Sequence, residues 1–237
     1  MTDGRAVETP AAVADLLAAS PETAYFWGRV AGDGDLTADC VTVHASDETA
    51  ADALSGVAGA DRTDRDHRVE SRASAHDASI VRYEDEYELQ VFGPPAERAS
   101  AALGLPLDGQ PGGYRFGAFD DHLAPLVRGL LEGCGTVCFR ESSASVGISF
   151  VHDDERLLET IRSLLSDAEP AVPTDDLEES SSGGYWFGLA DEADAAAFAE
   201  WVYADSDASG LYSAQRRRKL QRSVERASGA DVGALGE

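Results

Sequence analysis

The sequence contains almost no lysine, few cysteines and no long apolar run. Lys219 is the one lysine among 19 basic residues, so nearly all the positive charge is carried by arginine. No run of about 18 apolar residues occurs, which excludes a predicted transmembrane helix. The N-terminus also lacks the basic start and the apolar block of a secretory signal. We therefore expect a cytoplasmic protein without a membrane partner.

The three cysteines, Cys40, Cys134 and Cys138, do not have the spacing of a metal site. Cys134 and Cys138 lie close together, but no second pair of cysteines accompanies them. A structural zinc site needs four ligands, and the five histidines are scattered along the chain rather than clustered. We therefore expect reduced, structural thiols.

Positive charge of any kind is scarce. The chain has 44 acidic residues against 19 basic ones, and its net charge is −25. One interpretation is a basic partner. The other is adaptation to a salt-rich cytoplasm, where surface carboxylates maintain solubility and the Debye length shrinks to ~3 Å at 1 M salt. The composition resembles that of proteins from salt-loving archaea and favours the second interpretation. Net charge therefore does not exclude DNA as a partner.

The order of predicted elements indicates two similar halves with a Gly/Pro-rich segment between them. Each half begins with an apolar helix that ends in Gly-X-Gly and continues with strands and an amphipathic helix. We also expect a short leading helix at VADLLAAS and a hairpin turn near residues 84–86. The predicted organisation is an N-terminal extension at 1–22, a first half at 23–105, a linker at 106–120, a second half at 121–226 and a frayed tail at 227–237.

Two nine-residue stretches, FWGRVAGDG (26–34) and VRGLLEGCG (127–135), place small residues at helical spacing. Glycine costs ~1 kcal/mol inside a helix, so its use there suggests close packing of two helices. The residues at the eighth position, Asp33 and Cys134, would then meet at the foot of a pseudo-twofold axis. For Asp33 the alternative is an ordinary helix end followed by a turn. The predicted interface glycines are Gly28, Gly32, Gly34, Gly129, Gly133 and Gly135.

These stretches resemble the two motifs of the LAGLIDADG homing endonuclease family, the first closely and the second loosely. The strand–strand–helix order after each stretch and the Arg-Lys tail also agree, so the resemblance covers roughly residues 20–226. It implies an α/β fold of two pseudo-symmetric halves, with the motif helices at the interface and two antiparallel sheets forming a DNA saddle. It further implies a monomer, duplex DNA as partner, and motif acids that hold Mg²⁺ beside the scissile phosphates.

The resemblance assigns Asp33 as the catalytic and metal-binding acid of the first motif. Cys134 occupies the same position in the second motif, and a neutral thiol is a poor ligand for Mg²⁺. Glu132 cannot replace it, because two residues on a helix rotate the side chain by roughly 200°. We therefore expect a degenerate nuclease whose double-strand cleavage is weakened or lost.

The basic cluster near the C-terminus is the densest in the chain, and it predicts phosphate contacts. The alternative is a solvated helix face paired with acidic neighbours. Arg140, on a predicted strand, is a candidate for a contact to DNA. The predicted DNA-binding residues are Arg140, Arg216, Arg217, Arg218 and Lys219.

Three functions remain open at this stage. The first is a duplex DNA-binding protein with cleavage weakened or lost. The second is an active Mg²⁺-dependent homing endonuclease or nickase that uses Asp33. The third is a domain of the same fold that mediates protein contacts, which a saddle lined by acids rather than arginines would indicate.

Overall fold

The computed structural model describes residues 10–60, 62–70, 81–181, 183–191 and 194–229, and only the backbone is considered at 62–70 and 81–85. Most of the predicted tail, residues 230–237, lies outside this part of the chain, as do residues 1–9 of the predicted extension. None of the described helices is long and apolar enough to span a membrane.

The first half contains one four-stranded antiparallel sheet, sheet A, in the order β1-β2-β4-β3. Its elements are α1 (Pro21–Asp33), β1 (Gly34–Thr37), β2 (Cys40–Ala45), α2 (Glu48–Ala58), β3 (Arg62–Glu70), β4 (Val81–Phe92) and α3 (Pro95–Leu103).

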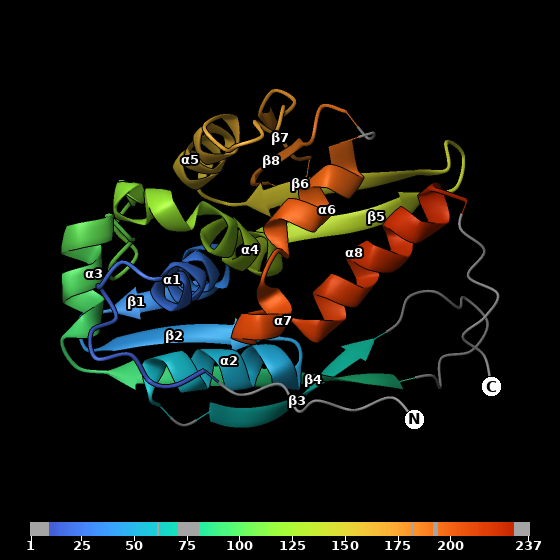
Figure 1. Ribbon diagram of the computed structural model, residues 1–237. Helices are drawn as coiled ribbons and strands as arrows, with labels where there is room; N and C mark the ends of the chain where they lie inside the picture. The colour runs from blue at the N-terminus through green and yellow to red at the C-terminus, as the bar shows by residue number, and fades with distance from the viewer. Residues whose placement is uncertain (1–9, 61, 71–80, 182, 192–193, 230–237) are drawn as a thin grey trace.

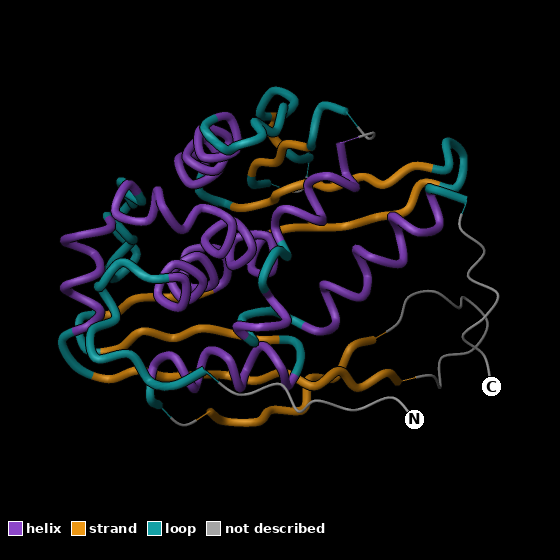
Figure 2. The backbone as a smooth tube through the Cα atoms, viewed as in Figure 1, coloured by secondary structure: helices purple, strands orange, loops and turns teal. Residues whose placement is uncertain are grey.

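The second half repeats this order and forms sheet B, β5-β6-β8-β7, which is also antiparallel. Its elements are η1 (Gly117–His122), α4 (Leu123–Cys134), β5 (Gly135–Arg140), β6 (Ser145–His152), α5 (Glu155–Ser166), β7 (Glu178–Glu179), β8 (Tyr185–Gly188), α6 (Ala195–Val202), α7 (Ser206–Ser209) and α8 (Ala214–Ala227). Helices α1 and α4 lie side by side between the two sheets (Figures 1 and 2). The predicted fold class is confirmed.

Local sequence explains where the main helices begin. Ser20 forms a capping box with Thr23 ahead of Pro21, which occupies the first turn of α1. Asp47 caps α2 by accepting from the Ala50 backbone N–H at 3.1 Å. Asp154 caps α5 in the equivalent place of the second half.

Two local predictions were wrong. The stretch VADLLAAS is not helical, because Ser20 is held extended before Pro21 and the chain instead runs across α1. There the Leu16 carbonyl accepts the Trp27 indole N–H at 2.6 Å. Residues 84–86 form no turn either, because β4 is one central strand paired with β2 and β3 on its two edges. Tertiary pairing overrides the weak strand propensity of its acidic residues.

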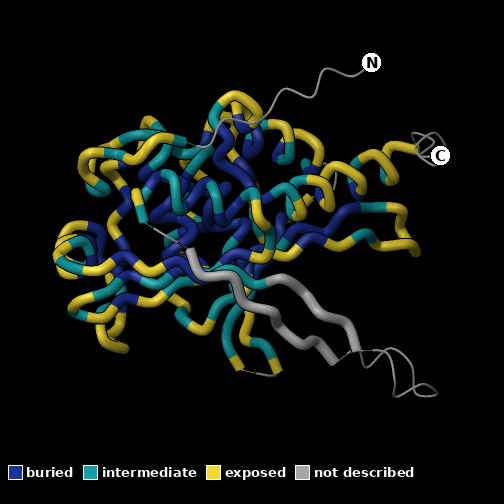
Figure 3. Tube along the Cα trace, turned by 90° about the horizontal axis from the view of Figure 1, so that it is seen from below, coloured by how far each residue is buried: buried dark blue, intermediate teal, exposed yellow. Residues whose placement is uncertain are grey.

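Four of the six predicted interface glycines let α1 and α4 approach backbone to backbone. The other two, Gly34 and Gly135, instead have their nearest neighbours in their own half, at Val30 and Thr42 and at Leu131. A Cβ built on Gly32 would lie 3.1 Å from the Cys134 amide nitrogen, and one on Gly133 would lie 2.9 Å from the Gly32 Cα. At Gly28 and Gly129 the added carbon would overlap carbonyl oxygens of the opposite helix. Buried residues gather around this helix pair at the centre of the molecule (Figure 3). The core of both halves is therefore assembled on the contact between the two motif helices.

Replacing Gly129 with alanine is expected to lower the free energy of unfolding by about 1–3 kcal/mol, because it overpacks this contact. The added Cβ would lie 2.8 Å from the Arg29 amide nitrogen. Gly117→Ala is the matched control, since its nearest neighbouring atoms are 4.0 Å away. Urea denaturation of both variants measures the difference, and equal stabilities would contradict the close packing.

Candidate functional site

A cleft of about 1020 Å³ opens at the foot of the helix pair, between the two halves. It is lined by the end of α1, the end of β2, the start of α5 and the linker between the halves. Carboxylates dominate its charged lining: Asp33, Asp35, Asp153, Asp154 and Glu155, with Arg156 as the arginine among its lining residues. The cleft therefore brings the predicted acid Asp33 to a solvent-accessible place between the sheets.

Asp33 is the last residue of α1 and is exposed at the edge of this cleft. Partial burial of its carboxyl raises its pKa, while the charges of Arg29, His44 and Arg216 oppose the shift. Arg29 is buried and donates to the His44 carbonyl, so it fixes the end of β2 beside Asp33. The first motif thus presents one carboxylate at the edge of an acid-lined cleft, and Arg29 and Arg216 lie close enough to oppose the rise in its pKa.

The second motif has a buried thiol, Cys134, at the position that corresponds to Asp33. Cys134 is only 9% exposed, and its S–H donates to the Leu130 carbonyl at 3.4 Å within α4. Burial, and then the charge of Asp33, raises the pKa of this thiol to about 12. The group is therefore neutral at physiological pH and already hydrogen-bonded.

These residues do not fit a Mg²⁺ ion, which requires several oxygen ligands in near-octahedral geometry. Asp33 supplies a single carboxylate, and Cys134 supplies a neutral sulfur. Among the described residues, no group of three or more His, Cys, Asp or Glu side chains is arranged to hold a metal. All three cysteines are free thiols.

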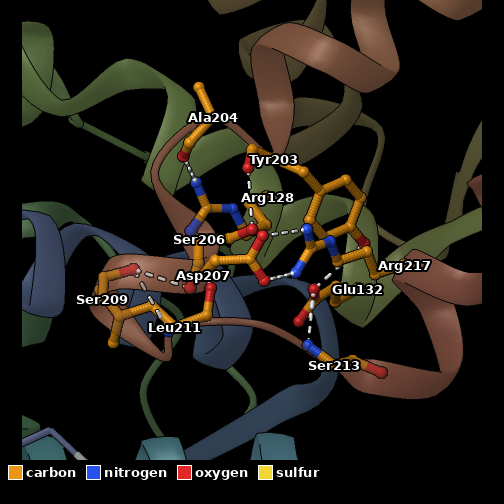
Figure 4. A network of polar contacts seen from close by, with 10 residues as sticks. All are labelled: Arg128, Glu132, Tyr203, Ala204, Ser206, Asp207, Ser209, Leu211, Ser213 and Arg217. Atoms are coloured by element: carbon orange, nitrogen blue, oxygen red, sulfur yellow. Dashed lines mark hydrogen bonds and ion pairs between the residues drawn. The ribbon is translucent and has the colours of Figure 1, made fainter. Parts of the chain in front are cut away.

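Glu132 points away from the cleft into a buried network (Figure 4). It is 3% exposed and accepts from the Tyr25 hydroxyl at 2.7 Å, the Tyr203 hydroxyl at 3.1 Å and the Ser213 backbone N–H at 2.8 Å. Burial raises its pKa, against the opposing charge of Arg29. Glu132 is thus committed to joining α1, α4 and the start of α8, and is not a second metal ligand.

Arg128, one turn before Glu132, is a second buried charged residue in this network and is 1% exposed. Its guanidinium donates to the carbonyls of Val202 at 2.7 Å, Leu211 at 2.8 Å and Ala204 at 2.8 Å. These three carbonyls belong to the end of α6 and the segment before α8. This role of Arg128 was not predicted from the sequence, although two charges four residues apart in an apolar helix were a usable signal.

The strands present one face to the helices and one open face, which we define by the alternation of side chains. On sheet B the open face carries Arg140 and small polar side chains, and a Cβ on Gly147 would lie 3.1 Å from the Arg140 Nε. On sheet A it carries the exposed Asp35 and Phe92, the latter 71% exposed. Glu88 belongs to the same face but is only 8% exposed and accepts from the Gln90 amide at 2.9 Å. Arg140 is the one arginine or lysine among the strand residues whose side chains are described. The described open face is therefore acidic on sheet A and mildly basic on sheet B.

Helix α8 covers the other face of sheet B. Arg226 lies over the Phe139 ring at 4.4 Å, and Phe139 points to the face opposite its neighbour Arg140. The predicted basic cluster on α8 is therefore separated from Arg140 by the sheet.

The residues of that cluster have different surroundings. Arg217 pairs with Asp207 and lies 4.9 Å from the centre of the Tyr212 ring. Arg216 is half-buried, and its charge opposes the rise in the pKa of Asp33 that burial causes. Arg218 and Lys219 are exposed. The four residues therefore differ in their surroundings: Arg217 is held in an ion pair, Arg216 lies near the foot of the helix pair, and Arg218 and Lys219 face solvent.

Comparison with protein families places residues 1–230 in a LAGLIDADG family described as "Putative archaeal homing endonuclease". No curated protein gave a match. Among solved structures, the homing endonuclease I-WcaI bound to its DNA recognition sequence matches with a TM-score of 0.55 and 8% identity over 85% of this chain and 86% of that one.

Two further structures are similar. The N-terminal LAGLIDADG domain of DUF199/WhiA matches with a TM-score of 0.50 and 13% identity over 79% of this chain and 84% of that domain. Full-length DUF199/WhiA from Thermatoga maritima matches with a TM-score of 0.50 and 11% identity over 86% of this chain and 60% of that protein. At these identities the likeness establishes the fold alone.

Proposed function

Because the chain belongs to the LAGLIDADG family of homing endonucleases, we propose that it binds duplex DNA along the open faces of its two sheets without cutting both strands. The observation that carries the proposal is the pairing of one carboxylate, Asp33, with a buried thiol, Cys134, at the foot of the helices. Cleavage of two strands needs two sites that stabilise developing charge on phosphate, and only one of the two motif positions holds an acid.

The proposed organisation is a monomer whose halves, residues 23–105 and 121–226, each face one half of the DNA site, joined by the linker at 106–120. In this proposal Arg140 contacts a base edge or a phosphate, and Arg216 contacts phosphate near Asp33. Support for a DNA partner comes from the shared fold with I-WcaI, whose structure contains its DNA recognition sequence.

The acids on sheet A are compatible with DNA binding provided that the salt concentration is high. In the major groove a carboxylate accepts a hydrogen bond from the cytosine amino group, so acids can read bases as well as repel phosphates. Repulsion across the chain, with its net charge of −25, is screened at molar salt, where the Debye length is ~3 Å. Binding should therefore be measured in high salt.

The test is a selection from genomic and random duplex pools in molar KCl with Mg²⁺, followed by sequencing of retained duplexes and of newly formed ends. Enrichment of a sequence that stays intact is the expected result. A break in both strands at the centre of the enriched sequence would contradict the loss of cleavage. A nick in one strand would show that Asp33 suffices for a nickase.

A second candidate function is a protein-contact domain, which the carboxylates and the 71% exposed Phe92 on sheet A favour. An exposed aromatic side chain on a face that also carries acids is typical of a surface that meets a basic, partly apolar protein. Absence of any enriched DNA at every salt concentration would support this candidate against the first.

Arg140→Gln is expected to weaken binding to the enriched duplex by about 1–3 kcal/mol and to relax base preference at one position, because the guanidinium fork is lost. Arg98→Gln is the control, since Arg98 pairs with Asp15 at 3.0 Å on another part of the surface. Fluorescence polarisation with the enriched duplex and single-base variants measures both effects. Equal affinities of the two variants would remove Arg140 from the interface.

A further inference from the structure

A row of cations runs along α8 on the side of sheet B opposite Arg140. Arg218, Arg222 and Arg226 are four residues apart and therefore share one face of the helix, with Lys219 beside them. These four residues line a groove of about 540 Å³ together with Phe139 of β5 and Asp47 at the start of α2. We call this surface the α8 groove.

Two arginines at the margins of this row are already paired. Arg217 forms an ion pair with Asp207, and Arg226 forms one with Glu141 at 3.2 Å while it covers the Phe139 ring. Those pairs hold α8 to the segment before it and to the β5–β6 hairpin. They explain two of the basic residues on α8 by structure alone.

Among the described residues, no ion pair of this kind accounts for the other three cations, Arg218, Lys219 and Arg222. All three are exposed, and within the described part of the chain none of them forms an ion pair. The chain has 44 acidic residues against 19 basic ones, so adjacent cations left without a carboxylate stand out against its composition.

The carboxylate that lines the groove is already occupied. Asp47 accepts from the Ser213 hydroxyl, from the Ala214 backbone N–H at 3.2 Å and from the Ala50 backbone N–H at 3.1 Å. It therefore caps both α2 and α8 rather than pairing with the row of cations. The groove keeps its positive charge available for a partner.

We propose that the α8 groove binds the phosphate backbone of a nucleic acid, as a second surface distinct from the open faces of the sheets. The inference rests on the proposed function for the identity of the polyanion. Arg218 and Arg222 are separated by about 6 Å along the helix axis, and guanidinium groups bind phosphate oxygens in pairs.

Nucleic acid suits this row better than an acidic peptide does. Arg218, Lys219 and Arg222 place three cations within about 6 Å of helix axis. One strand of duplex DNA carries a phosphate per about 3.4 Å of its axis, so a single strand offers this row about two phosphates over that length and further phosphates on either side. A peptide strand advances about 3.3 Å per residue and alternates its side chains between two faces, so it presents one carboxylate per about 6.6 Å even when every residue is acidic. The groove and Arg140 lie on opposite faces of sheet B, so one protein could hold a specific DNA site and a second stretch of backbone.

The experiment compares Arg218→Gln/Arg222→Gln with the control Arg98→Gln/Arg162→Gln, which removes the same charge from two exposed ion pairs elsewhere. Glutamine retains helix propensity, and melting curves by circular dichroism confirm that both variants fold. Fluorescence polarisation then follows binding to a 30-base-pair duplex of random sequence across KCl concentrations. The groove variant is expected to bind about tenfold more weakly, with a log K against log [KCl] slope smaller by about 1.8.

Each outcome decides the proposal. Equal affinity and equal slope in the two variants would overturn the proposal that the α8 groove binds nucleic acid. The proposal that the open faces of the sheets bind duplex DNA would remain intact, provided that the duplex selection still enriches a sequence. Groove-dependent binding without any enriched sequence would support the groove and contradict specific binding at the saddle. Tighter, groove-dependent binding of polyglutamate than of DNA would overturn the nucleic-acid assignment in favour of an acidic protein, and no binding to either polymer would overturn the groove altogether.

Discussion

Replacing Arg128 with leucine is expected to lower the free energy of unfolding by about 3–5 kcal/mol, the largest effect on stability that we predict. Arg128 is 1% exposed, and its guanidinium donates to three backbone carbonyls, one at the end of α6 and two in the segment between α6 and α8. Leucine would leave these carbonyls without their donor. It would also remove a positive charge that stabilises the buried carboxylate of Glu132 and opposes the rise in its pKa. Burial itself lowers the pKa of Arg128, so the site tolerates the charge only because of these partners.

Urea denaturation in molar KCl measures this loss against Arg98→Leu, which removes an exposed ion pair and should cost less than about 1 kcal/mol. Arg128→Lys is expected to recover little of the lost free energy of unfolding, because one ammonium group cannot reproduce the planar guanidinium that donates to three carbonyls. A leucine variant as stable as the control would show that α6 and α8 are held to α4 by apolar contacts alone.

Local and repeated features of the sequence predicted two similar halves and the contact between them, and the resemblance to the LAGLIDADG family implied the two antiparallel sheets. Glycines at helical spacing, found in two stretches, predicted a close contact of two helices and hence the pairing of the halves. Capping residues such as Asp47 lie next to the helices that they begin. Each of these signals is contained within a few residues, so neither needed knowledge of the tertiary structure.

The parts that sequence alone did not predict depend on contacts between distant segments. The basic cluster at residues 216–219 was predicted to contact DNA, and its place relative to Arg140 depends on the buried Leu220, which turns α8 against the helix-covered face of sheet B. The exposure of Phe92 depends on strand register, which the false turn at 84–86 concealed. Arg128 and Glu132 become a network only when Tyr25 and Ser213 are brought to them.

Exchanging Cys134 for aspartate is expected to create a metal-binding pair of carboxylates at the foot of the helices, the largest functional change that one substitution should make here. Both motif positions would then supply an oxygen ligand, as the family resemblance implies for Mg²⁺. The variant should gain about 2.7 kcal/mol of stability when free Mg²⁺ is 100-fold above its Kd, whereas the wild type should gain nothing.

Without metal the same variant should be less stable than the wild type at neutral pH. Burial already raises the pKa of Asp33, and a second carboxylate nearby would raise the pKa of the pair further. A carboxyl whose folded pKa is raised stabilises the fold below its unfolded value of ~3.9, and that stability is lost as the pH rises through the folded pKa. The loss should therefore develop above pH 4 in EDTA and be reversed by Mg²⁺.

Cys134→Asn is the matched control, because asparagine has the shape of aspartate without its charge. Thermal melts of the three proteins at pH 5 and pH 8, in EDTA and in Mg²⁺, separate a metal effect from a packing effect. If aspartate and asparagine respond alike to Mg²⁺, the foot of the helix pair is too crowded to hold a metal, and the loss of cleavage has a cause beyond the missing acid. If only the aspartate variant responds, position 134 alone accounts for the lost ligand, and incubation of that variant with the selected duplex then shows whether strand cleavage returns with the metal.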